Sequence, residues 1–257
     1  MPHATVAFST LALMSVARIL VLVLVLLPLA AGGAEPVRSP DRVGVEAVLA
    51  GSELWLADGQ IVRLAGIRVP EAVGPAARQM LRTLLQAAGV RLRPDDPPVD
   101  RWGRLVAGVE LADGRSLQAA LLEQGLAVVE PGPDVLDLAR LQARERAARA
   151  AGQGIWARAD AVLPADPARL APGFAIVRGE VRKLARTRSA VYLNFGEPWW
   201  ADFTLKIGAP EIEQAFAARG LALDRLPGRT VEARGFIVEA GGPLIELFQP
   251  DQLEVVR

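Results

Sequence analysis

The chain has 257 residues and equal numbers of basic and acidic side chains, 29 of each, so no overall positive charge draws it toward nucleic acid. It contains no cysteine, which excludes disulfides, thiolate nucleophiles and cysteine-bound metals. Its one histidine, His3, lies in a segment that we expect to be removed, so catalysis by imidazole is excluded as well. Carboxylates, arginines, two lysines, one tyrosine and an oxygen-liganded metal remain as candidate catalytic groups.

Residues 1–34 are predicted to be a secretory signal peptide. Arg18 supplies the positive flank, residues 19–27 form an unbroken apolar run, and a proline and small residues lead to a cleavage site after Ala34. The run is shorter than the roughly 20 apolar residues that a membrane-spanning helix needs. We therefore expect an exported protein, periplasmic or extracellular. The alternative is an uncleaved signal anchor, which would attach the protein to a membrane.

A short polar linker at 35–42 leads into a stretch that predicts a small barrel covered by helices. Apolar alternation bounded by turns indicates strands, and apolar residues three and four apart followed by glycine indicate helices. Strands followed by helices on one side are typical of an α+β fold. The expected strands are 43–49, 54–56, 61–64, 90–92 and 104–111, and the expected helices are 75–88, 117–123 and 134–151, with a loop at 93–100.

Several motifs give residues 43–158 a resemblance to a known family. They are L-x-D-G-x-x-V-R-L-x-G-I-x-x-P-E from Leu56 to Glu71, D-R-W-G-R from Asp100, D-G-R-S-L, L-L-E-Q-G-L-A-V-V, and A-R-x-A-G-Q-G-I-W ending at Trp156. In order and spacing these resemble the staphylococcal nuclease (thermonuclease) family. The resemblance implies a five-stranded barrel of the oligonucleotide-binding (OB) type with three helices.

The resemblance also implies roles for three charged residues. In the family, two arginines bind the phosphate under attack and a glutamate positions the attacking water. These roles map onto Arg63, Arg104 and Glu71 of this chain. Planar guanidinium groups suit this task because they bind phosphate oxygens in a bidentate manner. The alternative is that the same residues form a structural arginine–glutamate network at the mouth of the barrel.

The calcium ligands of the family are not retained in this sequence. Ser52 and Arg68 stand where the family has aspartate ligands, and Glu53 is one position away from the first and is expected on the other face of its strand. Calcium needs six to eight oxygen ligands, several of them anionic. We therefore expect no cofactor, and we expect calcium-dependent hydrolysis to be lost.

The second half of the chain predicts another barrel. Residues 159–173 contain prolines and alanines and are expected to be a linker. Residues 174–257 then predict five strands with a helix at 210–219 between the third and the fourth, which is typical of a second OB-type barrel. This stretch is similar to a domain that often follows thermonuclease-like domains in bacterial secreted proteins. The expected strands are 174–181, 189–196, 202–207, 229–238 and 243–248.

One hairpin of the second barrel combines basic and aromatic side chains. Such a combination suits single-stranded nucleic acid, because bases stack on rings while cations neutralise phosphates. The alternative is a solvated basic turn beside core aromatics. The residues concerned are Arg182, Lys183, Arg186, Arg188, Tyr192 and Trp199.

Three functional hypotheses follow from the sequence. The first is an exported protein that binds DNA, RNA or another acidic or phosphate-bearing partner without cutting it efficiently. The second is an active phosphodiesterase that uses Arg63, Arg104 and Glu71. The third is a protein-interaction module of the cell envelope, in which these residues are only structural.

Overall fold

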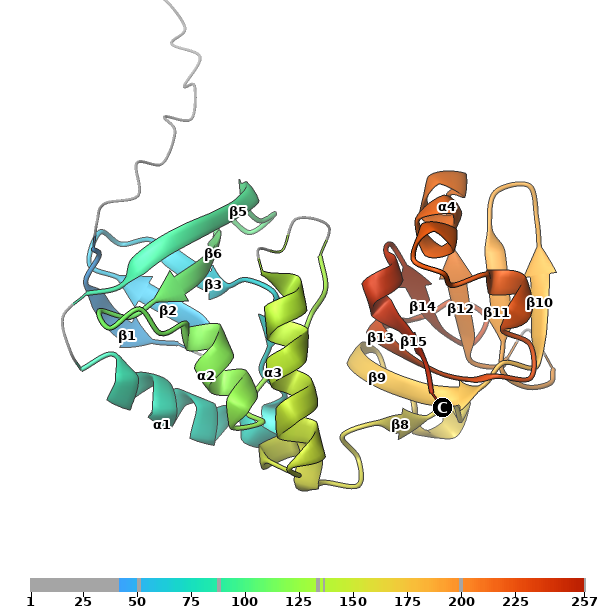
Figure 1. Ribbon diagram of the computed structural model, residues 1–257, viewed down its shortest axis with the longest axis horizontal. Coiled ribbons are helices and arrows are strands. Elements are labelled where there is room, and N and C mark those ends of the chain that lie inside the picture. Colours follow the sequence, from blue (N-terminus) through green and yellow to red (C-terminus); the bar gives the residue numbers. More distant parts are fainter. Residues whose placement is uncertain are drawn as a thin grey trace, which may run out of the picture. The chain divides into compact units, whose positions relative to one another are not determined.

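A computed structural model describes residues 42–49, 52–86, 89–132, 135, 137–198 and 201–256, with the backbone alone at 95–97 (Figure 1). The predicted signal peptide lies outside these residues. Ser39–Arg257 form one compact unit, which contains two β-barrels. The boundaries predicted between the two barrels therefore stay predictions. Within the described part of the chain, no helix has the length and apolar character needed to cross a membrane.

The first barrel is built on a five-stranded sheet with the order β1-β2-β3-β6-β5. Strands β3 and β6 run parallel, while their neighbours run antiparallel. Val43 and Val90, which precede β1 and β5, exchange two hydrogen bonds of 2.8 Å and close the sheet on itself. The strands are β1 Val45–Val48, β2 Glu53–Leu56, β3 Ile61–Leu64, β5 Arg91–Val99 and β6 Leu105–Glu110, with a separate pair of β4 Ile67–Arg68 and β7 Val128–Val129.

Strand β5 is longer than expected, because the stretch 93–99 was predicted to be a loop. Prolines interrupt this stretch, yet Pro94 still pairs with Ala107 of β6. β5 is the last strand of the five in the sheet order, where a missing backbone N–H can face away from the neighbouring strand. The register shift between Pro94 and Val99 shows where the pairing is interrupted.

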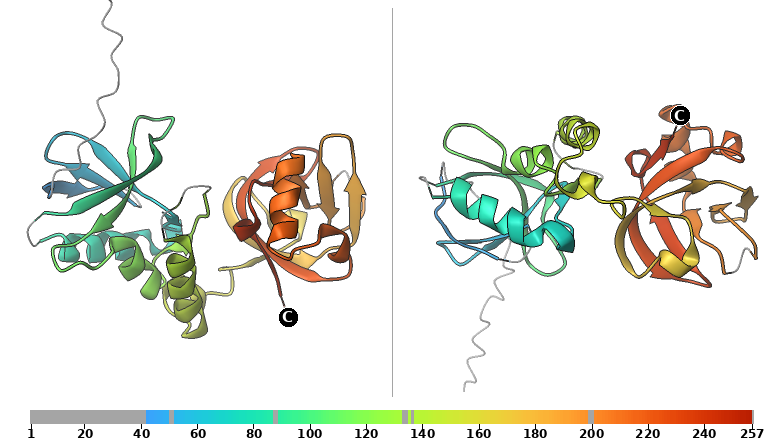
Figure 2. Two further views of the ribbon diagram at one scale, coloured as in Figure 1. Left: turned by 45° about the horizontal axis from the view of Figure 1, so that its top comes forward. Right: turned by 90° about the horizontal axis from the view of Figure 1, so that it is seen from below.

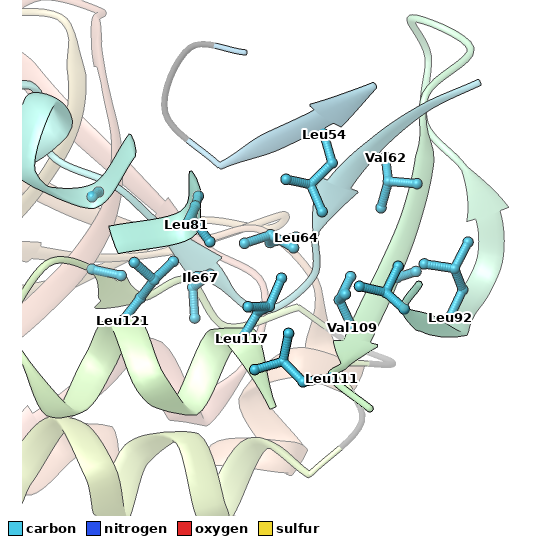
Figure 3. Close-up of a cluster of buried hydrophobic side chains, with 14 of the residues drawn as sticks. Leu54, Val62, Leu64, Ile67, Leu81, Leu92, Val109, Leu111, Leu117 and Leu121 are labelled. Atoms are coloured by element: carbon cyan, nitrogen blue, oxygen red, sulfur yellow. The ribbon is translucent and has the colours of Figure 1, made fainter. Parts of the chain in front are cut away.

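The helices of the first barrel gather on one side of its sheet (Figure 1). Alternate residues of β2 and β3 point into the core, and there they meet leucines from the helices (Figure 3). Leu54, Leu64, Leu81 and Leu121 are completely buried in this cluster. The helices are α1 Gly74–Leu84, α2 Leu117–Glu123 and α3 Leu138–Ala150, with 3₁₀ turns η1 Glu71–Val73 and η2 Gly154–Ala157.

The second barrel has the same core topology as the first. Its sheet order is β10-β11-β12-β14-β13-β9-β8, with β15 on β13, and β12 and β14 are the parallel pair. The structure has eight strands here, where five were predicted. The elements are β8 Leu163–Pro164, β9 Gly173–Glu180, β10 Lys183–Arg186, β11 Val191–Asn194, β12 Thr204–Ile207, α4 Pro210–Ala218, β13 Thr230–Glu239, β14 Pro243–Leu247 and β15 Leu253–Val255, with 3₁₀ turns η3 Pro167–Arg169, η4 Leu223–Arg225 and η5 Pro250–Gln252.

One bent segment closes the second barrel. Only Val181 and Arg182 separate β9 from β10. The amide of Val181 donates to Arg229 O (3.0 Å) beside β13, and the amide of Arg182 donates to Asn194 O (2.8 Å) of β11. Because β9 pairs with β13 and β10 pairs with β11, this segment joins the two sides of the sheet and closes the barrel. Helix α4, orange in Figure 2, lies beside the sheet and inserts the fully buried Phe216 into the core.

Candidate functional site

The strands of the first barrel place Glu53 and Arg63 on its outer face. Because the residues at alternate positions, such as Leu54 and Val62, are buried, Glu53 and Arg63 must point the other way. The two residues are direct cross-strand partners. Arg104 comes immediately before β6 and forms a hydrogen-bonded ion pair with Glu53. The expectation that Glu53 faces away from the site is therefore wrong.

Asp100 holds the loop between β5 and β6 in place. Its carboxylate accepts hydrogen bonds from the amides of Trp102 (2.9 Å) and Arg104 (3.1 Å) and from Nε of Arg104 (2.8 Å). Gly103 permits the turn, because its φ of 77° is rarely adopted by other residues. Burial raises the pKa of Asp100, but the hydrogen bonds from Arg104 outweigh this effect and keep it below its ordinary value. Asp100 is therefore an anion that fixes Arg104.

Arg68 contacts one carboxylate and two aromatic rings. Strand β4 pairs with β7, so that Arg68 lies opposite Val128, close to Glu130. Nη2 of Arg68 lies 3.0 Å from Oε1 of Glu130. The guanidinium also lies 4.6 Å from the ring centroid of Phe236 and 5.3 Å from that of Phe174, which is cation–π geometry.

Arg63 completes the network more loosely. Its Nη1 is 3.5 Å from Oε2 of Glu130, and its Nε is 3.9 Å from Oδ2 of Asp100. Arg63 and Arg104 thus share Asp100, and Arg63 and Arg68 share Glu130. The three arginines are balanced by three carboxylates, so the network has no net charge.

Of the residues predicted for the site, the structure joins Arg63, Arg104 and Arg68 through shared carboxylates. Glu71 is exposed at the start of η1, and none of the ion pairs among the described residues includes it. Ser52 is half-buried in the turn before β2, where its carbonyl accepts a hydrogen bond from the amide of Leu64 (2.9 Å). The catalytic role predicted for Glu71, and the prediction that Ser52 and Arg68 occupy former metal-ligand positions, therefore stay predictions.

Sequence reasoning did not identify Asp100 and Glu130 as members of the site. An aspartate that precedes a glycine turn often accepts backbone hydrogen bonds, so the D-R-W-G-R motif carried a signal for Asp100. No sequence signal indicated Glu130, because it is brought close to Arg68 only by the pairing of β4 with β7.

The side chains present do not fit a calcium ion. Each nearby carboxylate is engaged by an arginine: Glu53 by Arg104, Asp100 by Arg104, and Glu130 by Arg68. Within the described ranges, no three Asp, Glu, His or Cys side chains gather as they would around a metal. Arg68 also places a cation beside Glu130, and this charge would repel a divalent ion.

Two exposed tryptophans belong to the same outer surface of the first barrel as the arginines. Trp102, at the tip of the β5–β6 loop, is 64% exposed, and the guanidinium groups of Arg101 and Arg104 lie 4.0 and 4.7 Å from its ring. Trp55 and Ile61 are cross-strand partners on the outer face of β2 and β3, and both are exposed. Rings beside cations form a surface on which bases can stack.

The basic residues of the second barrel are divided between two faces. Lys183 and Tyr192 share the outer face of β10 and β11, whereas Arg186 belongs to the alternate face. Arg186 pairs with Glu213 (2.7 Å) and Asp224 (3.0 Å), and Arg182 pairs with Glu180 (2.8 Å). Arg188 is exposed after β10. Trp199 lies outside the described residues, and the nucleic-acid role of the whole set stays a prediction.

Comparison with known proteins supports the first barrel's identity. No curated protein matches the chain. Residues 61–158 match the family model of staphylococcal nuclease homologues. The match contains Arg63, Arg68, Glu71 and Arg104, and it ends at the predicted end of the first domain. Residues 61–158 are therefore similar to the staphylococcal nuclease homologues, and they supply β3, β5, β6 and the helices of the first OB-type barrel.

Proposed function

We propose that the first barrel binds single-stranded nucleic acid and does not cut it in a calcium-dependent manner. The similarity of residues 61–158 to a nuclease family supports nucleic acid as the ligand class. The observation that carries the proposal is the ion pair between Arg68 and Glu130, at 3.0 Å. A calcium site needs carboxylates that are free to coordinate the ion, and Glu130 is already engaged by a cation.

Arg63 is the guanidinium best placed to receive a phosphate. Its contacts with Glu130 and Asp100, at 3.5 and 3.9 Å, are longer than good charge-assisted hydrogen bonds. Arg104, by contrast, makes two contacts below 3 Å with Asp100. Arg104 therefore supports the loop, and Arg63 can turn toward a ligand with little loss.

The aromatic side chains favour a single strand over a duplex. Trp102 and Trp55 can stack only on bases whose faces are open. Trp55 lies on β2, and Trp102 lies on the loop between β5 and β6, which are the fourth and fifth strands of the barrel. OB folds bind oligonucleotides on this surface. Because the arginine–carboxylate network is neutral, stacking must supply much of the affinity.

Digestion of DNA tests the absence of catalysis. The mature protein is incubated with single-stranded DNA in calcium or in a chelator, beside the Glu71→Gln variant. We expect no cleavage in any of these reactions. Cleavage that the chelator abolishes and that Glu71→Gln removes would instead establish an active phosphodiesterase and refute the proposal.

Fluorescence anisotropy with a labelled oligo-dT tests binding. We expect Trp102→Ala to weaken binding on the order of tenfold, since stacking is worth about 1–3 kcal/mol per base. Arg63→Ala should reduce the salt slope by about 0.7, the value for one lost phosphate contact on a single strand. Arg82→Ala, which removes an exposed cation of α1, is the control. Unchanged binding in both test variants would place the oligonucleotide away from the barrel mouth and refute the proposal, and no binding by the unchanged protein would favour an envelope interaction module.

We also propose that the protein is exported, on the basis of residues 1–34 alone. Mass spectrometry of the protein from the producing cell should show a mature chain that begins at Glu35. A chain that retains its first 34 residues and fractionates with membranes would instead indicate a signal anchor.

A further inference from the structure

A cavity of about 610 Å³ lies apart from the arginines of the barrel mouth. Helix α3 forms one wall, and the segments 219–234 and 250–255 form the other. Cavities of this size hold small molecules or parts of larger ones. Six arginines line it: Arg146, Arg149, Arg219, Arg225, Arg229 and Arg234.

Three of these arginines are bound to carboxylates that line the same cavity. Arg149 donates to both oxygens of Glu232 at 2.6 and 2.8 Å. Arg234 donates to Glu145 at 2.7 Å. Arg219 contacts Asp251 at 2.5 Å. In the first two pairs the carboxylates, Glu232 and Glu145, are buried, so these arginines are already engaged in the protein.

The other three arginines have no such partner. Arg146, Arg225 and Arg229 are exposed, and no ion pair within the described ranges includes any of them. The remaining carboxylate of the lining, Glu254, makes no ion pair there either. Six arginines against the four carboxylates Glu145, Glu232, Asp251 and Glu254 leave a local charge of +2. The whole chain has a formal charge of zero, so this excess is a local feature.

We infer that this cavity is a binding site for two or more phosphate groups in succession, as in an oligophosphate or a nucleic-acid backbone. Guanidinium groups are suited to phosphate oxygens, and three of them are available around one space. Among the described residues that line the cavity there is no aromatic side chain on which bases could stack. The site would therefore recognise phosphates irrespective of base, unlike the surface around Trp102.

Two ligands are compared, to distinguish an oligophosphate from a nucleic-acid backbone as the bound molecule. Inorganic tripolyphosphate and an oligo-dT of twelve nucleotides are titrated by calorimetry into the mature protein at low salt. The test variant is R146A/R225A/R229A. The control is R82A/R140A/R169A, which removes the same charge from exposed positions outside this cavity. A lysine variant, R146K/R225K/R229K, keeps the charge.

We expect the alanine variant to lose on the order of tenfold or more in tripolyphosphate affinity, because charge-assisted hydrogen bonds to phosphate are lost. The control should bind as the unchanged protein does, and the lysine variant should lie between the two. If oligo-dT also occupies the cavity, the alanine variant should lower its salt slope by about 2, roughly 0.7 for each of three phosphates. Thermal unfolding of each variant checks that it is folded.

The inference fails if the unchanged protein does not bind tripolyphosphate, or if the alanine and control variants weaken binding equally. It also fails if Arg63→Ala, and not the cavity variant, abolishes tripolyphosphate binding. These outcomes are separate from those of the barrel mouth, where loss of stacking at Trp102 would leave tripolyphosphate binding intact.

Discussion

The loop between the fourth and fifth strands presents an exposed aromatic side chain in the first barrel, whereas it is a short glycine turn in the second. In the first barrel this loop runs from Asp100 to Arg104 and presents Trp102 to solvent. In the second barrel the equivalent turn between β13 and β14 contains Gly241 and Gly242, which have no side chain to offer a ligand. Under the proposed function, the ability to bind bases therefore depends on the side chains of this loop and not on the barrel that carries them.

The outer faces of the two barrels also differ in how their cations are paired with carboxylates. In the first barrel Arg63 belongs to a network of three arginines and three carboxylates. In the second, Lys206 of β12 has one partner, Glu246 of β14, at 3.0 Å. A network can reorganise around a phosphate by exchanging partners, whereas an isolated pair offers one cation that is already satisfied.

The largest expected effect concerns the core residues that each barrel receives from its helix. Leu81 of α1 and Phe216 of α4 are both fully buried. We expect Phe216→Ala to cost about 4 kcal/mol and Leu81→Ala about 3 kcal/mol of unfolding free energy. Urea unfolding followed by circular dichroism measures both. Since Arg149–Glu232 and Arg234–Glu145 link the barrels, each variant should lower one common midpoint. Two separate transitions would contradict this coupling.

The strands of both barrels could be predicted where one face is buried. Alternation at Leu54 and Leu56, or at Leu205 and Ile207, gives a clear period of two. Strand β10 was missed because its sequence K-L-A-R buries little. Strand β5 was shortened because prolines in a sequence usually indicate a loop.

The site could be predicted only where a motif carried it. The motifs placed Arg63 and Arg104 together, because the parallel pairing of β3 with β6 is a property of the fold. The aromatic partners of Arg68 could not be predicted, since Phe174 and Phe236 belong to strands of the other barrel. A sequence pattern records neighbours along the chain, and contacts between barrels leave no such record.

The second-largest effect should come from the buried carboxylate that joins the barrels. Glu232 is 4% exposed and binds Arg149 and Arg178. Burial raises its pKa, but the hydrogen bonds from the two arginines outweigh burial and hold it below the ordinary 4.5. We expect Glu232→Gln to cost about 2 kcal/mol, less than for a fully buried pair because the arginines are partly exposed.

The pH dependence follows from the direction of that shift. The stabilisation from Glu232 is fully present above pH 4.5 and is lost as pH falls through the lowered pKa of the folded state. Denaturant titrations from pH 6 to pH 3 should therefore show the difference between the unchanged protein and Glu232→Gln shrinking with acidity. A difference that stays constant would contradict the ionised state of Glu232.

A smaller loss of stability is expected when either of two aspartates that accept hydrogen bonds from loop amides is replaced. Asp100 accepts from two amides and from Arg104, whereas Asp202 of the second barrel accepts from the amides of Phe195 (2.6 Å) and Gly196. Asparagine keeps an acceptor oxygen but loses the charge. We expect Asp100→Asn to cost about 1.5 kcal/mol and Asp202→Asn less than about 1 kcal/mol. Thermal unfolding measures both, and the reverse order would show that the arginine contributes little.

The smallest effect should come from the isolated pair of Lys206 and Glu246, whose side chains are 32% and 35% exposed. The hydrogen bond to Glu246 raises the pKa of Lys206 above its ordinary 10.5, so any stabilisation is present below that pH and disappears as pH rises through the raised pKa. Solvent screening limits the pair to about 0.5 kcal/mol. Lys206→Gln should therefore shift unfolding at pH 7 by less than Asp202→Asn does. A loss as large as that of Glu232→Gln would mean that the outer face of the second barrel is organised by this pair, and the contrast between the barrels would then be wrong.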